Sequence, residues 1–142
     1  MNSRNDYFRI ILVVFCALFL ASCGVPMVEG TKWLDSKNDR PEINISGMWT
    51  SPEWGAATFK QEGKDIIGVL GDCPVRGVVS GTSIYLLMYQ GDSVIYFAEL
   101  KASDGKTFEG VYSLKYATID ELKKDNPAYR RPMSIIFIST LP

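Results

Sequence analysis

Residues 93–116 read SVIYFAELKASDGKTFEGVYSLKY, which is two apolar runs separated by Ser103-Asp104-Gly105. Both runs are rich in aromatic, β-branched and other apolar residues, as strands are. A three-residue loop sets apolar residues against one another, whereas a slip of one residue would mix the two faces. The sequence therefore predicts a hairpin with a bulged loop, in which Gly105 takes the left-handed conformation that glycine adopts without strain.

This register makes further predictions about both faces of the hairpin. The inner face carries four opposed pairs: Leu100 with Phe108, Ala98 with Gly110, Tyr96 with Tyr112, and Val94 with Leu114. The outer face is mixed and sets Glu99 opposite Glu109, which destabilises slightly unless Lys101 lies between them. Ala98 and Gly110 are small, so we expect a gap between the bulky inner residues.

Similar runs recur from Gly47 onward, separated by short links rich in Gly and Asp. We expect eight strands, over 47–51, 55–62, 65–71, 74–80, 82–90, 93–102, 106–116 and 133–140. Links of hairpin length predict an all-β fold, an eight-stranded antiparallel meander. Eight strands can close into a small barrel, and Gly68, Gly77 and Gly110 are points where strands can bend.

One short helix is predicted before the last strand. Thr118 and Glu121 form a capping box, acidic residues fill the first turn, lysines fill the last, and Pro127 ends the segment. Two turns are marginal alone, so we expect Ile119 and Leu122 to pack onto one end of the sheet. The helix would then serve as a plug, which we favour, or as a lid over a cavity.

The N-terminus has the pattern of an export signal. Arg4 and Arg9 precede an unbroken apolar run from Ile10 to Leu20, too short for a membrane-spanning helix of about 20 residues. Leu20-Ala21-Ser22-Cys23 resembles the lipobox of bacterial lipoproteins. The resemblance implies removal of residues 1–22, a diacylglyceryl group on Cys23 and acylation of the new N-terminus, palmitate being a typical acyl group. Gly24, rather than aspartate, resembles lipoproteins of the outer membrane.

We expect residues 23–45 to be a lipidated tether and residues 46–142 to be one domain. The segment before Ile45 is polar and interrupted by Gly and Pro, and as a flexible coil it would span about 25 Å. Trp33-Leu34 is its one apolar site. These two residues either dock on the domain surface, which we favour, or contact the membrane interface.

Gly47-Met48-Trp49, at the start of the first strand, resembles the Gly-x-Trp motif of lipocalins and their calycin relatives. The motif Gln61-x-Gly63-x-x-Ile66-x-Gly68 and the segment 75–81 are similar to small lipocalin-like barrels of bacterial lipoproteins. This resemblance implies a barrel that holds a small apolar ligand. It also implies an arginine stacked on Trp49, for which Arg130 and Arg131 are the candidates.

The composition argues against catalysis. The chain contains no histidine, which excludes imidazole-based triads and metal sites. Cys73 is the one thiol left after export and lipidation, and we interpret it as an inert packing residue. The 15 basic and 16 acidic side chains balance, so we expect no nucleic-acid partner. We therefore predict no enzyme activity, no cofactor and no metal.

Two functions of different classes remain open. In the first, which the lipocalin resemblance favours, the barrel binds a small apolar or amphipathic ligand. The residues expected to line that site are Trp49, Tyr96, Ala98, Phe108, Gly110 and Tyr112. In the second, the barrel is solid and its rim contacts another envelope protein, as an inhibitor or assembly factor would. In both, the lipid on Cys23 makes the membrane a partner.

Overall fold

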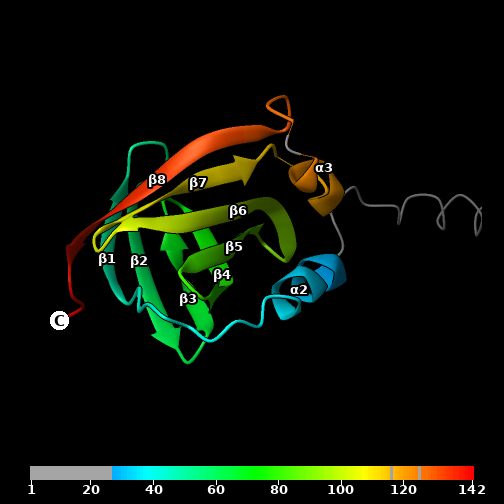
Figure 1. Cartoon of the computed structure of the whole chain (residues 1–142). Coiled ribbons are helices and arrows are strands. Elements are labelled where there is room, and N and C mark those ends of the chain that lie inside the picture. The colour runs from blue at the N-terminus through cyan, green and yellow to red at the C-terminus, as the bar shows by residue number, and fades with distance from the viewer. Residues whose placement is uncertain (1–26, 116, 125) are drawn as a thin grey trace, which may run out of the picture.

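The computed structural model describes residues 27–115, 117–124 and 126–142 (Figure 1). Within these residues there are two helices, α2 (Met27–Asp35) and α3 (Ile119–Lys123), and eight strands. The strands are β1 (Gly47–Ser51), β2 (Gly55–Glu62), β3 (Asp65–Leu70), β4 (Cys73–Ser80), β5 (Ser83–Gln90), β6 (Ser93–Asp104), β7 (Thr107–Ser113) and β8 (Arg130–Ser139). The all-β class and the short helix before the last strand are confirmed.

The eight strands form a closed antiparallel barrel in sequential order. Closure is made by β1 and β8, where Trp49 pairs with Phe137 and Thr50 with Ile136. A closed sheet leaves no strand edge unpaired, which removes the usual route to edge-to-edge association. The last strand begins at Arg130 rather than at the predicted residue 133.

Four of the hairpin links are built as the sequence predicted. Gly63, Gly71, Gly81 and Gly91 all have φ between 58° and 61°. This is the left-handed conformation that tight hairpin turns require and that glycine adopts most easily.

The β6–β7 hairpin differs from the predicted register by two residues. Ala98 pairs with Tyr112, Leu100 with Gly110, and Ala102 with Phe108, with a bulge between Ala102 and Asp104. Because the shift is even, the inner and outer faces are as predicted, but every opposed pair is different.

The turn of this hairpin explains the shift. Gly105 is not left-handed. Instead the Asp104 Oδ1 carboxylate oxygen accepts a hydrogen bond from the Lys106 amide at 2.7 Å, so a side chain closes the turn. On the outer face, Lys101 now lies opposite Glu109 and Glu99 opposite Val111, so the predicted pair of opposed glutamates does not form.

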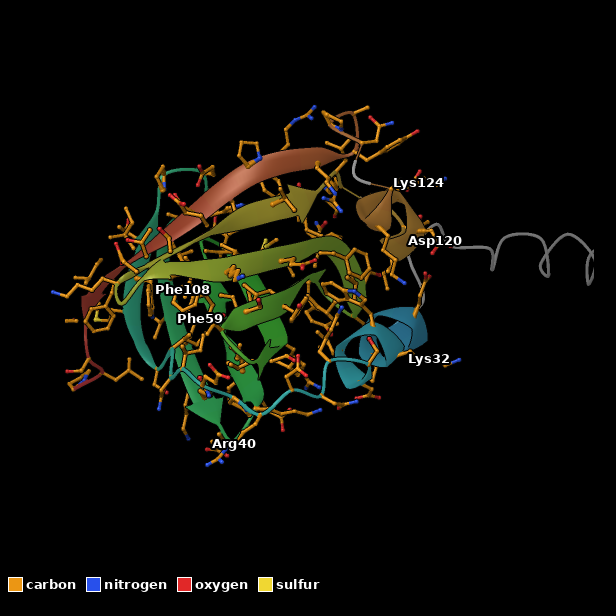
Figure 2. The ribbon with its side chains drawn as sticks, in the orientation of Figure 1. Lys32, Arg40, Phe59, Phe108, Asp120 and Lys124 are labelled. Carbon is orange, nitrogen blue, oxygen red and sulfur yellow. The ribbon has the colours of Figure 1, made fainter. Side chains whose placement is uncertain are left out.

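The barrel interior is packed with large side chains. Phe59, Ile66, Leu70, Ile84, Leu86, Met88, Leu100 and Ile135 are essentially inaccessible to solvent. Figure 2 labels Phe59 and Phe108, two members of this core. Burial of this apolar surface is the main driving force for folding.

The predicted gap between Ala98 and Gly110 is absent. Ala98 is fully buried opposite Tyr112. A methyl group added at Gly110 would collide with the Glu99 carbonyl oxygen and the Leu100 Cα. Gly110 therefore marks a close approach of two strands rather than an empty space.

The segment before the barrel contains a helix where a flexible coil was predicted. Helix α2 packs on the outer face of the barrel, where Trp33 is 5% exposed and Leu34 is also buried. The Trp33 ring meets Tyr85 and Phe97 edge to face, both at 5.6 Å between centroids. The docking of Trp33-Leu34 onto the domain surface is confirmed.

Helix α3 belongs to the same outer layer. The predicted capping box is present, with the Thr118 amide donating to Glu121 and the Glu121 amide donating to the Thr118 hydroxyl. Ile119 is buried in a second core on the outside of the barrel, whose other buried members are Trp33, Leu34, Val78, Leu87, Val94 and Phe97. Ile119 therefore holds α3 against the outside of the barrel, beside α2 and near the end of β7, and not over the barrel interior as the predicted plug or lid.

Candidate functional site

The two ends of the barrel are built differently. We call the end that carries the links 52–54, 71–72, 91–92 and 114–129 the mouth, and the opposite end the base. At the base, Trp49 is 3% exposed and packs edge to face on Phe108 and Phe137, with centroids 5.5 and 5.1 Å apart. Its indole Nε1 donates to the Ile45 carbonyl at 2.9 Å. Aromatic packing therefore fills the base.

At the mouth, three aromatic rings form a cluster. Trp54, from the link between β1 and β2, lies 5.0 Å from the Tyr96 ring and 5.2 Å from the Tyr112 ring. The two tyrosine rings are 6.0 Å apart, and all three contacts are edge to face. Such contacts between rings add to the stabilisation that comes from burying their apolar surface. All three residues are partly buried and pack against the core.

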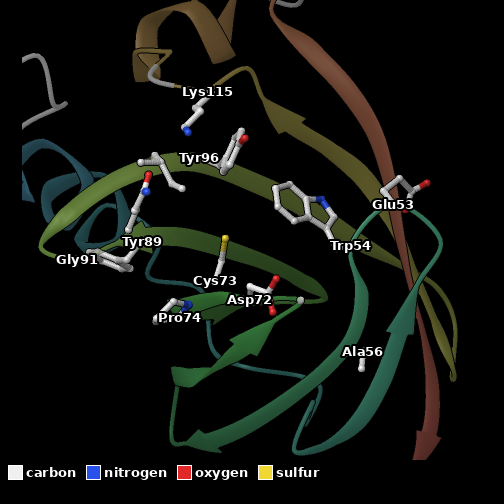
Figure 3. Close-up of a pocket in the computed structure, with 13 residues that line it drawn as sticks. Glu53, Trp54, Ala56, Asp72, Cys73, Pro74, Tyr89, Gly91, Tyr96 and Lys115 are labelled. Carbon is white, nitrogen blue, oxygen red and sulfur yellow. The ribbon is translucent and has the colours of Figure 1, made fainter.

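Beside this cluster the mouth is hollow. The hollow has a volume of about 780 Å³ and is open to solvent. Its lining includes Glu53, Trp54, Asp72, Cys73, Tyr89, Tyr96 and Lys115. Figure 3 shows the Trp54 ring reaching inward from the β1–β2 link, with Cys73 and Lys115 approaching the same space from below and above. The lining thus combines aromatic surface with one thiol and charges of both signs.

Trp54 also carries an unusual polar group. Its indole Nε1 is buried, and no hydrogen-bond acceptor lies within reach among the residues that the structure describes. A buried donor without a partner costs about 1–3 kcal/mol, so such groups are rare in native proteins. An acceptor supplied by a bound molecule would remove that cost.

Cys73 is the free cysteine of the described chain and is half-buried. Burial raises the pKa of its thiol, the Asp72 carboxylate raises the pKa further, and the Lys115 ammonium group acts in the opposite direction. A thiol with a raised pKa is protonated at neutral pH and is a poor nucleophile. This agrees with the interpretation of Cys73 as a packing residue.

The six predicted ligand-site residues do not form one site. Tyr96 and Tyr112 lie together at the mouth. Trp49 and Phe108 lie together at the base. Ala98 is buried between the two layers, and Gly110 pairs with Leu100.

The predicted stacking of an arginine on Trp49 is wrong. Arg130 pairs with Ser113 and Arg131 with Tyr112, both near the mouth, whereas Trp49 pairs with Phe137. Six residues of strand separate Arg131 from Phe137, which is about 20 Å. Phenylalanine rings take the place on Trp49 that the lipocalin resemblance gave to an arginine.

Sequence reasoning missed Trp54, Tyr89, Asp72 and Lys115. The one available signal was a tryptophan next to Pro52-Glu53 in a short link, because links of this length are usually polar. Nothing in the local pattern says that this ring turns inward over the core.

The described residues contain no cluster of Cys, Asp and Glu that could hold a metal ion. Nor do they include a helix with the length and apolar character needed to cross a bilayer. Cys23, the predicted lipidation site, lies outside the described residues.

No protein-family model, curated protein or solved structure matches this chain.

Proposed function

We propose that this protein is a lipid-anchored lipoprotein of the bacterial envelope whose barrel binds a small amphipathic molecule at its mouth. The observation that carries the proposal is the hollow lined by Trp54 and Tyr96, together with the buried indole N–H of Trp54, which has no acceptor among the described residues. Small-molecule sites commonly combine an apolar or aromatic wall with a few placed polar groups, in volumes of roughly 300–1,000 Å³.

The packed core limits where the ligand can lie. Large side chains fill the barrel below the aromatic cluster, so the ligand occupies the mouth and does not enter the interior. Its apolar part contacts the aromatic rings. The Trp54 N–H is closed to solvent, so it bonds an acceptor oxygen of the ligand only when the indole turns toward the hollow. Glu53 and Asp72 oppose Lys115 in charge, so the lining does not select strongly for an anion or a cation.

The envelope location is supported by the sequence. Leu20-Ala21-Ser22-Cys23 resembles a lipobox, and Gly24 is typical of lipoproteins carried to the outer membrane. The proposal is binding without catalysis, because the chain has no histidine and the pKa of its half-buried thiol is raised. The closed eight-stranded barrel is the fold that the resemblance of Gly47-Met48-Trp49 to the lipocalin motif implies.

The second candidate function is a protein-interaction module. It is favoured by apolar side chains exposed on the outer faces of β1, β3 and β8, of which Ile67 is 54% and Ile138 is 57% exposed. The other exposed members are Met48, Val69 and Ile136. Exposed apolar groups of this kind often mark contact surfaces for other proteins.

One titration separates the two functions. A variant without residues 1–22 and with Cys23→Ser is titrated with single-chain fatty acids and an apolar fluorescent dye. Trp54→Phe keeps a ring but removes the N–H donor, so we expect affinity to fall about 5–10-fold, the loss of one hydrogen bond. Trp49→Phe, at the base, is the matched control and should leave affinity unchanged.

Two outcomes would contradict the binding proposal. One is no binding of any probe below about millimolar concentration, which would leave the interaction module as the function. The other is an equal effect of the two substitutions, which would mean that the probe does not contact the mouth.

A further inference from the structure

The position of the lipid anchor relative to α2 restricts how the barrel can face the membrane. Helix α2 begins at Met27, four residues after Cys23. It is held on the barrel by Trp33 and Leu34, and the Lys37 ammonium group lies 4.5 Å from the centre of the Tyr85 ring. The predicted free tether of about 25 Å is therefore replaced by a short connection to a docked helix.

Helix α2 starts near the mouth and leads the chain to the base. Gly30, in its first turn, lies against Leu87 and Val94, and Val94 is the second residue after the β5–β6 link at the mouth. Farther along, the Asp39 amide donates to the Ser80 hydroxyl at 3.0 Å, next to the β4–β5 link at the base. The N-terminus of α2 therefore lies on the mouth side of the molecule.

Helix α3 lies on the same side. It follows β7 at the mouth and contacts α2, and a shallow pocket between the helices is lined by Lys32, Ile119 and Lys123 among others. Figure 2 shows Lys32, Asp120 and Lys124 together on this side, away from Phe59 and Phe108. The helices and the mouth thus form one continuous end of the molecule.

Chain length then decides which end can reach a bilayer. Four residues of fully extended chain span at most about 14 Å. A folded domain of this size has a diameter of about 35 Å, from its expected radius of gyration. With the lipid on Cys23 in the bilayer and α2 docked, the barrel cannot stand on its base, because the start of α2 would then lie farther from the membrane surface than four residues can span.

We infer that the mouth end of the barrel, with α2 and α3 beside it, faces the bilayer that holds the anchor. This inference rests on the lipidation of Cys23 in the proposed function and specifies the ligand class. A mouth facing the bilayer takes its ligand from the membrane, so that ligand is an amphipathic lipid. The exposed charges around the helices are mixed, with Lys32 and Lys123 near Asp120, so the anchor rather than electrostatic attraction sets the orientation.

Depth-dependent quenching tests the orientation. The mature lipidated protein, residues 23–142 in a Cys73→Ser background, carries a fluorophore at Lys124→Cys beside the mouth or at Lys106→Cys in the base turn. It is reconstituted on the outside of phosphatidylethanolamine–phosphatidylglycerol vesicles that contain a headgroup nitroxide lipid. We expect the label at position 124 to be quenched several-fold more than the label at position 106, in low salt and in 0.5 M salt alike.

Lengthening the connection is the control. Twenty Gly and Ser residues inserted after Gly24 add an r.m.s. reach of about 25 Å, so the two labels should become similarly quenched. Equal quenching without the insertion would overturn the inference. A difference that persists with the insertion, or that disappears in high salt, would also overturn it, because the anchor would not be its cause.

Vesicle flotation tests the lipid anchor separately from the orientation. If the wild-type protein, without substitution or insertion, fails to float with the vesicles, the lipid anchor of the proposed function is wrong. If the protein floats but the two labels are quenched equally, the anchor stands and the orientation is wrong.

Discussion

Single residues decide the geometry of the β6–β7 hairpin. In the sequence, Gly105 looked like the residue that the turn requires, but the structure gives that role to the Asp104 carboxylate. Asp104→Ala removes the acceptor of the Lys106 amide, so we expect a loss of about 0.5–1.5 kcal/mol in the free energy of unfolding. Gly105→Ala should leave the free energy of unfolding unchanged or raise it slightly. Urea denaturation measures both variants. A larger loss for Gly105→Ala than for Asp104→Ala would mean that the turn is built differently.

Gly110 is the residue whose side chain the fold cannot accommodate. An added Cβ would collide with the Glu99 carbonyl oxygen, which is backbone and cannot rotate away. We expect Gly110→Ala to destabilise the barrel by about 1–3 kcal/mol, as overpacking does. Gly105→Ala is again the matched control, because its Cβ would meet no atom within 4 Å. An equal, small effect at both positions would show that the strands do not approach closely at Gly110.

The reactivity of the Cys73 thiol reports on its surroundings at the mouth. Because burial and Asp72 raise the pKa of its thiol, less thiolate is present at pH 8 than in an unfolded chain. Alkylation by iodoacetamide should therefore be slower in the folded protein than in urea, and the difference should shrink as the pH rises through the folded-state pKa. A folded protein that reacts faster than the unfolded chain would identify Cys73 as an activated thiol.

At the scale of elements, α2 is the feature that the sequence concealed. Gly30 is a poor helix former, by about 1 kcal/mol relative to alanine. The structure explains it, since a Cβ there would lie only 3.0 Å from the Leu87 Cδ1 atom. Burial of Trp33 and Leu34 supplies the stabilisation that local preference does not. Two adjacent apolar residues in a polar stretch predicted that docking, but they did not reveal the helix that carries it.

Substitution of Trp33 therefore tests whether residues 27–35 are a docked helix or part of a free tether. Trp33→Ala should cost about 3–5 kcal/mol in the free energy of unfolding, the range for a buried aromatic side chain. Lys32→Ala, one residue earlier and exposed, should change stability by less than about 0.5 kcal/mol. Thermal or urea unfolding gives both values. A neutral Trp33→Ala would mean that residues 27–35 are not part of the folded unit.

The other elements were largely accessible from the sequence, for physical reasons. Glycine and aspartate mark tight turns because few other residues adopt their backbone conformations, which is how the links at Gly63, Gly71, Gly81 and Gly91 were identified. The capping box at Thr118 and Glu121 is equally local. The β6–β7 register was not accessible, because a bulge at Ser103 adds a residue without leaving a pattern.

For the whole molecule, strand number and inward–outward parity follow from periodicity, but the site does not. Because side chains alternate between the two faces of a strand, the sequence predicted Tyr96 and Tyr112 on the inner face, where both pack against the core. Their partner Trp54 comes from a link, where the direction of a side chain depends on tertiary packing that periodicity does not encode. The closed base and the packed core then leave the mouth as the end with open aromatic surface, beside an indole donor that has no acceptor among the described residues.

The most direct measurement is the position of the Trp54 indole N–H resonance in a ¹H–¹⁵N NMR titration with a single-chain amphiphile. The chain has three tryptophans, Trp33, Trp49 and Trp54, so three indole resonances are expected. We predict that the resonance of the Trp54 indole proton moves downfield as the proton gains an acceptor, while that of Trp49, already bonded to the Ile45 carbonyl, stays in place. Saturation of the protein with no movement of the Trp54 resonance, or movement of Trp49 in its place, would contradict the account.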